Sequence, residues 1–277
     1  MFGFRPGRSI QDAISYTLDK IRHHRADKKM VAILSLDASA AFDLLQHDVI
    51  LRSLEIIGAG NKMQSLSRSF LSGCRNYVQI GDESSEEWIS DTGSGQGRRL
   101  SPPFFNISCI SQALLYKNSD FSGYADDGLD VVYGSTIEEC DKKLKLVVLE
   151  KVEWYRSIGL SLNLNKSEII GIGYSPAPVK IDDMLICLKQ EITFLGIKIQ
   201  SDLKWSSQVS ALSGKIRSAA SRIRIEGRHL CFLAYCHLRI LTVPRIISLN
   251  GIRFVSSRNM YRQVMALQEL SGRLWAL

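Results

Sequence analysis

Two adjacent carboxylates, Asp126 and Asp127, stand in the stretch SGYADDGLD between a turn of small residues and the apolar run 129–133. Adjacent like charges repel each other and Asp is a poor strand residue, so two of them at a junction of strands need an explanation. An ordinary surface turn is one explanation. A cation that normally sits between the carboxylates is the other. In both cases the stretch predicts a hairpin from Phe121 to Tyr133 with the two Asp residues at its tip.

A third carboxylate has a similar setting. The short apolar run Val31–Leu36 reads as a buried strand, and Asp37 falls at its end. Carboxylates at strand ends are common, so each signal is weak by itself. Together they supply the oxygen ligands from separate strands that two-metal phosphoryl transfer needs, with two Mg²⁺ ions ~3.5–4 Å apart. One metal would lower the pKa of an attacking 3′-hydroxyl and the other would neutralise the leaving pyrophosphate.

The remaining pattern predicts interspersed helices and strands. A capping box at Ser9 and apolar residues at helical spacing indicate a helix to about His24. The further elements that we expect are helices at 48–57, 62–71, from Ser101 onward, at 138–158 and beyond Trp205, a hairpin that pairs 77–80 with 87–90, and short strands at 169–173, 179–181 and 193–199. Strands and helices do not alternate regularly, so the sequence favours an α+β fold over a doubly wound sheet.

Charge is unevenly distributed along the chain. The net charge is +7, and residues 201–277 carry 12 Lys and Arg against 3 Asp and Glu. A basic C-terminal quarter suggests a polyanionic partner, although solvated helix faces would have the same composition. The N-terminus has no apolar signal-peptide core, no apolar run reaches the ~18 residues of a membrane span, and the six Cys lack framework spacing. We therefore expect a soluble intracellular protein of the cytoplasm or nucleus with no membrane partner.

Six blocks of sequence together resemble reverse transcriptases, in their order and rough spacing. They are FGFRPGRSIQDAI (2–14), LDASAAFD (36–43), GSGQGRRLSPPFFN (93–106), YADD (124–127), LNLNKSE (162–168) and FLGIKI (194–199). They look most like the non-LTR (LINE-type) retrotransposon branch of the family. The resemblance implies a right-hand polymerase fold, in which an antiparallel palm sheet is backed by helices. It also implies partial fingers at 1–30, a palm at 31–200 with a fingers-type insert at about 60–92, and an incomplete basic helical thumb at 201–277.

The resemblance also implies roles for individual residues. Asp37 and Asp126 would be the principal metal ligands, with the Ala38 carbonyl helping and Asp127 adjoining them. Phe42 falls at the steric-gate position, where an aromatic ring would exclude a 2′-hydroxyl. The other implied roles are contact with the incoming nucleotide or template (Gln96, Gly97, Arg5 and Arg8), action on the pyrophosphate (Lys166) and a primer-grip hairpin (Phe194, Leu195 and Gly196).

The implied function is RNA-directed DNA synthesis. The implied cofactor is Mg²⁺, with Mn²⁺ as a substitute, and the partners are an RNA template, a DNA primer or target, and deoxynucleoside triphosphates. Gly95 and Phe104 depart from the family pattern, which usually has Pro and Leu there, and Arg98–Arg99 is unusually basic. The fingers segments that precede the FGFRPGRS block in the family do not appear before Met1. An N-terminally truncated, inactive nucleic-acid-binding remnant is therefore the alternative function.

Two further interpretations have less support. Viral RNA-dependent RNA polymerases usually place a second Asp where this chain has Phe42, and Gly-Asp-Asp where it has Ala-Asp-Asp. A zinc site is suggested by His229, Cys231, Cys236 and His237. Their spacing fits no standard zinc finger, and the residues around them have the pattern of an apolar helix. We expect a thumb helix at that position.

Overall fold

The computed structural model describes residues 1–38, 41–95, 98–115 and 118–226. The chain divides into two units, Met1–Lys189 and Gln190–Leu277. Gln96 and Gly97 of the nucleotide-contact prediction, and the four residues of the zinc interpretation, lie outside the described residues.

A five-stranded sheet forms the centre of the first unit, with strand order β11-β8-β1-β7-β6. The strands are β1 (Met30–Leu36), β6 (Ser119–Tyr124), β7 (Asp127–Gly134), β8 (Glu168–Ile172) and β11 (Cys187–Leu188). Strand β1 is antiparallel to both of its neighbours, β7 and β8, and only β11 runs parallel to its partner. Five of the seven residues of β1 are buried, because helices cover both faces of the sheet. The predicted antiparallel sheet backed by helices, and with it the α+β class, is confirmed.

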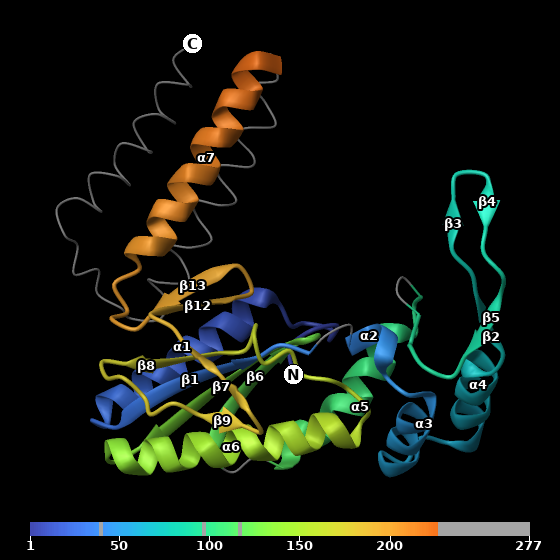
Figure 1. Ribbon diagram of the computed structural model, residues 1–277, viewed down its shortest axis with the longest axis horizontal. Helices are drawn as coiled ribbons and strands as arrows, with labels where there is room; N and C mark the ends of the chain where they lie inside the picture. Colours follow the sequence, from blue (N-terminus) through green and yellow to red (C-terminus); the bar gives the residue numbers. More distant parts are fainter. Residues whose placement is uncertain (39–40, 96–97, 116–117, 227–277) are drawn as a thin grey trace. The chain divides into compact units, whose positions relative to one another are not determined.

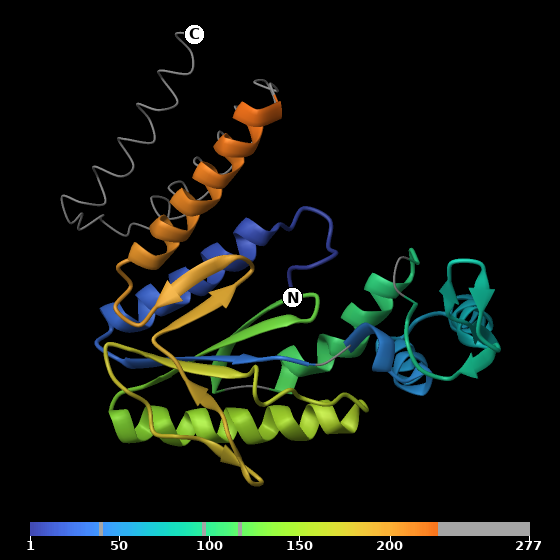
Figure 2. The same cartoon turned by 45° about the horizontal axis from the view of Figure 1, so that its top comes forward.

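Helices α1 (Ile10–Ala26) and α6 (Ile137–Ser157) lie on opposite faces of this sheet, as Figure 2 shows. Helix α1 begins with the predicted capping box, in which Ser9 and Asp12 each bond the backbone N–H of the other. Thr136 caps α6 through the N–H of Glu139. The buried side of α6 packs on Ala32, Leu34 and Val132, which point to the same face of the sheet.

A second hydrophobic cluster joins the helices α2 (Ala41–Leu44), α3 (His47–Ile56), α4 (Asn61–Leu71) and α5 (Ser101–Leu115). It is centred on Leu45, Ile50 and Phe104, all fully buried. Beyond α4 a long hairpin extends away from the cluster (Figure 1). Its strands are β2 (Cys74–Asn76), β3 (Gln79–Ile80), β4 (Glu83–Ser84) and β5 (Trp88–Ser90).

The predicted pairing inside this hairpin is wrong. Strand β3 pairs with β4, and β5 pairs with β2, so 77–80 does not pair with 87–90. The chain reverses earlier than expected because Gly81 adopts φ +63°, which permits a two-residue turn directly after Ile80. The segment 85–87 then leads to β5, whose partner lies before Tyr77.

Short strands β9 (Lys180–Ile181) and β10 (Met184–Leu185) complete the first unit. The second unit contains β12 (Glu191–Phe194), β13 (Ile197–Gln200) and helix α7 (Ser206–Glu226). Periodicity alone predicts one strand over 193–199, but Leu195 (φ +50°) and Gly196 (φ +80°) form a two-residue turn. Positive φ at both turn residues matches the tight turns that join antiparallel strands. The stretch is therefore a hairpin, as the family resemblance implies.

Candidate active site

The YADD motif forms the tip of the β6–β7 hairpin. Tyr124 pairs with Asp127, and Ala125 and Asp126 are the two residues of the turn. Ala125 adopts φ +56°, a conformation that a non-glycine residue rarely takes without support from its surroundings. Support comes from the N-terminal segment, since the N–H of Phe2 donates to the carbonyl of Gly123 over 2.7 Å. A Cβ on Gly3 would stand 2.6 Å from the backbone nitrogen of Ala125, so this position has room only for glycine.

Strand register brings Asp37 beside the same tip. Leu36 at the end of β1 is opposite Gly128 of β7, and the next pair in this register is Asp37 with Asp127. Directly opposed side chains lie on the same face of a sheet, so the two carboxylates point to one side. The face is the one on which α1 lies, because Ser122, on this face of β6, donates to the carbonyl of Ala13.

The negative charges of Asp37, Asp126 and Asp127 repel one another. Partial burial, and then the negative charges of Asp126 and Asp37, raise the pKa of Asp127. The Asp127 residue as a whole is exposed to solvent, so we give more weight to the two neighbouring charges than to burial. A divalent cation with hard oxygen ligands would relieve this repulsion, and the donor set therefore fits Mg²⁺.

The block LNLNKSE holds the backbone of Asp37 in place. Asn163 donates its N–H to the Asp37 carbonyl over 2.8 Å, and the Asp37 N–H donates to Ser167 Oγ over 3.3 Å. Ser167 Oγ donates in turn to the Asn163 carbonyl over 3.0 Å, and Ala38 forms a β-bridge with Leu162. Ser167 is fully buried. The block therefore acts as a clamp on the strand end that carries Asp37.

Lys166 belongs to this clamp through its backbone. Its N–H donates to the Asn163 carbonyl over 3.0 Å, which closes the turn 163–166, and its side chain is exposed. The turn thus places Lys166 next to the residues that hold Asp37.

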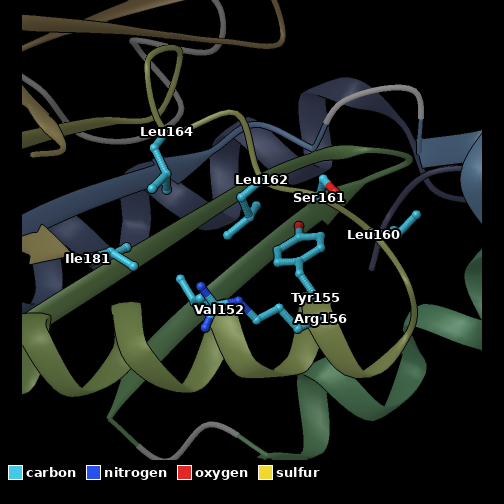
Figure 3. A pocket seen from close by; sticks show the side chains of 8 residues that line it. All are labelled: Val152, Tyr155, Arg156, Leu160, Ser161, Leu162, Leu164 and Ile181. Carbon is cyan, nitrogen blue, oxygen red and sulfur yellow. The ribbon is translucent and has the colours of Figure 1, made fainter. Parts of the chain in front are cut away.

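A cavity of about 220 Å³ lies beneath the segment that leads into the clamp. Its lining comes from α6 (Val152, Tyr155 and Arg156), from the segment 160–164 and from Ile181. Figure 3 shows the Tyr155 hydroxyl directed from α6 toward the segment that contains Ser161 and Leu162. Asp37, Asp126 and Asp127 are not among the residues that line this cavity.

The Phe42 ring is part of an aromatic stack, and its backbone carbonyl accepts a hydrogen bond from the block 93–106. Its ring stacks on Phe105 with centroids 4.4 Å apart, and the Phe4 ring meets it edge-on at 6.3 Å. The N–H of Ser94 donates to the Phe42 carbonyl over 2.9 Å. Gly95 follows with φ +74°, which a proline could not adopt, so its departure from the family pattern is built into the local backbone.

Arg5 and Arg8 are exposed in the N-terminal segment that supports the hairpin tip. Arg5 donates to the Met1 carbonyl over 3.2 Å, and the Arg8 guanidinium lies over the Phe2 ring at 5.9 Å. Both guanidiniums therefore contact the segment that touches Gly123.

The predicted primer-grip residues lie in the second unit. Phe194 is buried, and Leu195 and Gly196 form the hairpin turn. Gln208 of α7 accepts a hydrogen bond from the backbone of Lys198 over 2.9 Å, which ties the hairpin to the helix. Phe194 is thus a core residue of this unit.

Sequence reasoning missed three groups that shape this site: Ser167, Asn163 and Gly3. Ser167 and Asn163 lie inside a quoted block, and the Asn-x-x-x-Ser spacing suits a turn closed by side-chain to backbone hydrogen bonds. Gly3 gave no comparable signal, because a close approach between residues 3 and 125 is a property of the tertiary structure.

The repulsion at Asp127 predicts a stabilising substitution. In metal-free buffer at pH 7, Asp127→Asn should raise the melting temperature by about 1–2 °C, because screening keeps interactions between exposed carboxylates below ~1 kcal/mol. Because the pKa of Asp127 is raised in the folded state, its negative charge destabilises that state. This destabilisation is absent at low pH, where the carboxyl is protonated in both the folded and the unfolded state, and it grows as the pH rises above the ordinary pKa of 3.8. Calorimetry between pH 3 and 7 measures this gain, and a gain that shrinks with rising pH would contradict the assignment.

Comparison with known proteins identifies the chain. The model of the family "Reverse transcriptase (RNA-dependent DNA polymerase)" matches residues 1–199. An RNA-directed DNA polymerase from transposon X-element of Drosophila melanogaster is 24% identical over 230 residues, which are 80% of this chain and 25% of that protein. The R2DM polyprotein of the same species is 26% identical over 184 residues, 63% of this chain and 17% of that protein. The chain thus spans a quarter or less of the length of these two relatives.

Solved structures agree on the fold. Telomerase from Candida albicans, in complex with the TWJ fragment of telomeric RNA, superposes with a TM-score of 0.51 at 14% identity, over 97% of this chain and 56% of that one. An apo telomerase from Candida tropicalis without its C-terminal domain gives 0.51 at 16% identity, over 69% of this chain and 38% of that one. The predicted right-hand polymerase fold is confirmed. Among the described residues, the helices are too short or too polar to cross a membrane.

The relatives confirm the predicted resemblance to retrotransposon reverse transcriptases. Since the family model matches well over half of its residues, the chain belongs to the reverse transcriptase (RNA-dependent DNA polymerase) family.

Proposed function

We propose that this chain is the catalytic core of a non-LTR retrotransposon reverse transcriptase, which transfers a nucleotidyl group from a deoxynucleoside triphosphate to a primer 3′-hydroxyl on an RNA template. The observation that carries the proposal is the convergence of Asp37, Asp126 and Asp127 at one end of the sheet, where partial burial and then the charges of Asp126 and Asp37 raise the pKa of Asp127. Three carboxylates that repel one another suit a site whose function is to hold divalent cations.

In this proposal Asp37 and Asp126 would hold the metals, the Ala38 carbonyl would help, and Asp127 would adjoin them. Bound Mg²⁺, or Mn²⁺ in its place, would lower the pKa of the 3′-hydroxyl and neutralise the leaving pyrophosphate. The clamp by Asn163 and Ser167 fixes the backbone on either side of the Asp37 Cα, so this ligand is oriented before substrate arrives.

The other predicted residues would bind the nucleotide, the template and the primer. Lys166, on the clamp turn, would neutralise or protonate the pyrophosphate, and Arg5 and Arg8 would contact template or nucleotide phosphates. Gln96 and Gly97 follow the segment bonded to Phe42 and would lie near the incoming nucleotide. Phe194, Leu195 and Gly196 would position the primer end.

The division into partial fingers (1–30), palm (31–200, with an insert at about 60–92) and thumb (201–277) remains a prediction. Exposed Lys215 and Arg217 on α7 agree with a basic thumb that contacts RNA or DNA phosphates.

The direct test is primer extension on an RNA template with Mg²⁺ or Mn²⁺. A labelled DNA primer that grows only when deoxynucleotides and metal are both present would support the proposal. Extension that is absent from the wild type under all of these conditions would instead favour the inactive nucleic-acid-binding remnant.

Sugar discrimination gives a second test, at Phe42. The ring stacks on Phe105, which would restrict its rotation away from a 2′-hydroxyl. Phe42→Ala should raise the ratio of ribonucleotide to deoxynucleotide incorporation, measured as kcat/KM, by at least about tenfold, or ~1.4 kcal/mol. Phe70→Leu is the control, because Phe70 packs on Phe104 in the same cluster and has no role in the proposed gate. Unchanged discrimination in Phe42→Ala would refute the gate.

A further inference from the structure

We propose that His23, His24 and Asp27, at the C-terminal end of α1, form a binding site for a transition-metal ion of the Zn²⁺ class. One imidazole nitrogen from each histidine and one carboxylate oxygen of Asp27 lie within 4.8 Å of one another. The site is built from other residues than Asp37, Asp126 and Asp127, and it does not depend on polymerase activity.

The distances are close to those of a bound ion. Metal–ligand bonds of ~2.1 Å in a tetrahedral site place the ligand atoms about 3.4 Å apart. His23 Nε2 already stands 3.8 Å from Asp27 Oδ2, and both side chains are exposed, at 67% and 45%. Both can therefore rotate toward an ion at little cost, and the remaining coordination positions would be filled by water.

His24 supplies the strongest observation. Its side chain is only 6% exposed, its ring stacks on Tyr133 at 3.6 Å, and its Nε2 lies 2.7 Å from Asp120 Oδ2. Its Nδ1 is buried and, within the described part of the chain, has no hydrogen-bond partner. A neutral imidazole that donates from Nε2 to a carboxylate presents a lone pair on Nδ1, and an unmatched buried acceptor costs free energy.

This arrangement matches the way proteins prepare a histidine for a metal. A metal-ligating histidine commonly donates its other ring N–H to a carboxylate, which fixes the ring and raises its basicity. Asp120 takes the place of that carboxylate, and the Tyr133 ring holds the imidazole plane. His24 is therefore held in a fixed orientation, and the exposed side chains of His23 and Asp27 would rotate to bind the same ion.

The surrounding charges indicate which ion would bind. The helix C-terminus favours a cation, whereas Lys20 pairs with Asp120 at 2.9 Å and Lys29 approaches Asp27 at 3.4 Å. These ammonium groups already neutralise the carboxylates, so little net charge remains to attract a hard ion such as Mg²⁺. Imidazole nitrogen favours Zn²⁺, Co²⁺ or Ni²⁺ over Mg²⁺. The two imidazole ligands should therefore make the site bind Zn²⁺, Co²⁺ or Ni²⁺ in preference to Mg²⁺.

The consequence for the fold would be local. Asp27 and Lys28, the latter at φ +58°, form the turn between α1 and β1, which is the strand that ends at Asp37. A metal on His23, His24 and Asp27 would tie this turn to the helix and, through Asp120, to β6.

A Co²⁺ titration of the full chain tests the proposal. Cys231→Ser and Cys236→Ser in the parent protein remove the thiolates of the second His/Cys cluster, and excess Mg²⁺ occupies the catalytic carboxylates. We expect one Co²⁺ per chain with visible d–d absorption, displaced by Zn²⁺. His23→Ala and Asp27→Asn should each weaken binding at least about tenfold. Asp19→Asn is the matched control, because Asp19 is an exposed carboxylate of the same helix that pairs with Arg22.

Zn²⁺ should also raise the melting temperature of the parent protein and leave that of His23→Ala unchanged, a readout that needs no buried substitution. Absence of Co²⁺ binding, or equal binding by the parent, His23→Ala and Asp27→Asn, would overturn the proposal. Asp126→Asn should bind Co²⁺ like the parent, so failure of this site and failure of the polymerase proposal can be told apart.

Discussion

Asp126→Asn should lower primer extension on an RNA template by ~10³-fold, which corresponds to about 4 kcal/mol of lost transition-state stabilisation. Asp126 lies in the turn of the hairpin, where its carboxylate is exposed and the strand ladder does not use it. Asn keeps the size and loses the charge that would hold a metal. The substitution should therefore remove catalysis and leave the fold intact, and extension assays together with a melting curve measure the two effects separately.

Asp183→Asn is the control for this substitution, because Asp183 is a fully exposed carboxylate of the same unit that pairs with Lys180. It should extend primers at the wild-type rate. Asp37→Asn should resemble Asp126→Asn, since both residues act on the same charge at Asp127. Asp126→Asn activity within a factor of about three of wild type would eliminate this carboxylate as a metal ligand.

Lys151→Met should destabilise the protein by about 3–5 kcal/mol and lower its melting temperature by roughly 10 °C. Lys151 Nζ lies 2.6 Å from Asp130 Oδ2, and both side chains are only 2% exposed. Ser119 Oγ donates to the other Asp130 oxygen over 2.9 Å, and the ammonium stands 4.0 Å from the Phe121 ring centroid. Removal of the ammonium leaves a buried carboxylate without its counter-charge. Chemical denaturation followed by circular dichroism measures the loss.

The pH dependence of this loss has a definite sign. Burial raises the pKa of Asp130 and Lys151 lowers it, so without Lys151 the folded carboxyl holds its proton to higher pH. The deficit of Lys151→Met should therefore be smaller at pH 4 than at pH 8, because a protonated Asp130 has no charge to bury.

The matched control removes both charges. Asp130→Leu combined with Lys151→Met should recover most of the stability, because an apolar pair of similar volume often replaces a buried ion pair at no cost. A double variant no more stable than Lys151→Met would show that the single substitution acts through packing and that the ion pair is not responsible.

Much of the fold could be predicted because its signals are local. The Ser9 capping box, the apolar spacing of α6 and the β1 run each depend on neighbours a few residues away, and the observed bounds differ from the predicted ones by one or two residues. The long hairpin could not be predicted in the same way. Its pairing depends on the residue at which the chain reverses, and only the positive φ of Gly81 reveals that choice.

The candidate site shows the same division. The carboxylates could be found from sequence because three of them fall in ordered blocks that resemble one family, although each Asp at a strand end is a weak signal by itself. Lys151 could have been suspected, because it occupies an apolar position in the helical spacing of α6 and so must meet a buried partner. The pairing of His24 with Asp120, 96 residues apart, has no sequence signal and depends on the way α1 crosses the sheet.

The register of the β6–β7 hairpin has a consequence for how this motif can evolve. Asp127 and Asp130 are three residues apart, so in an alternating strand they point to opposite faces, one toward the ligand side and the other toward Lys151. Because the buried residues of β7 fix its register on β1, insertion or deletion of one residue before Asp127 would leave Asp130 facing Lys151 and would change the length of the turn that carries Asp126. The two carboxylates therefore constrain the length of the turn, and substitutions can accumulate around YADD where single-residue length changes cannot.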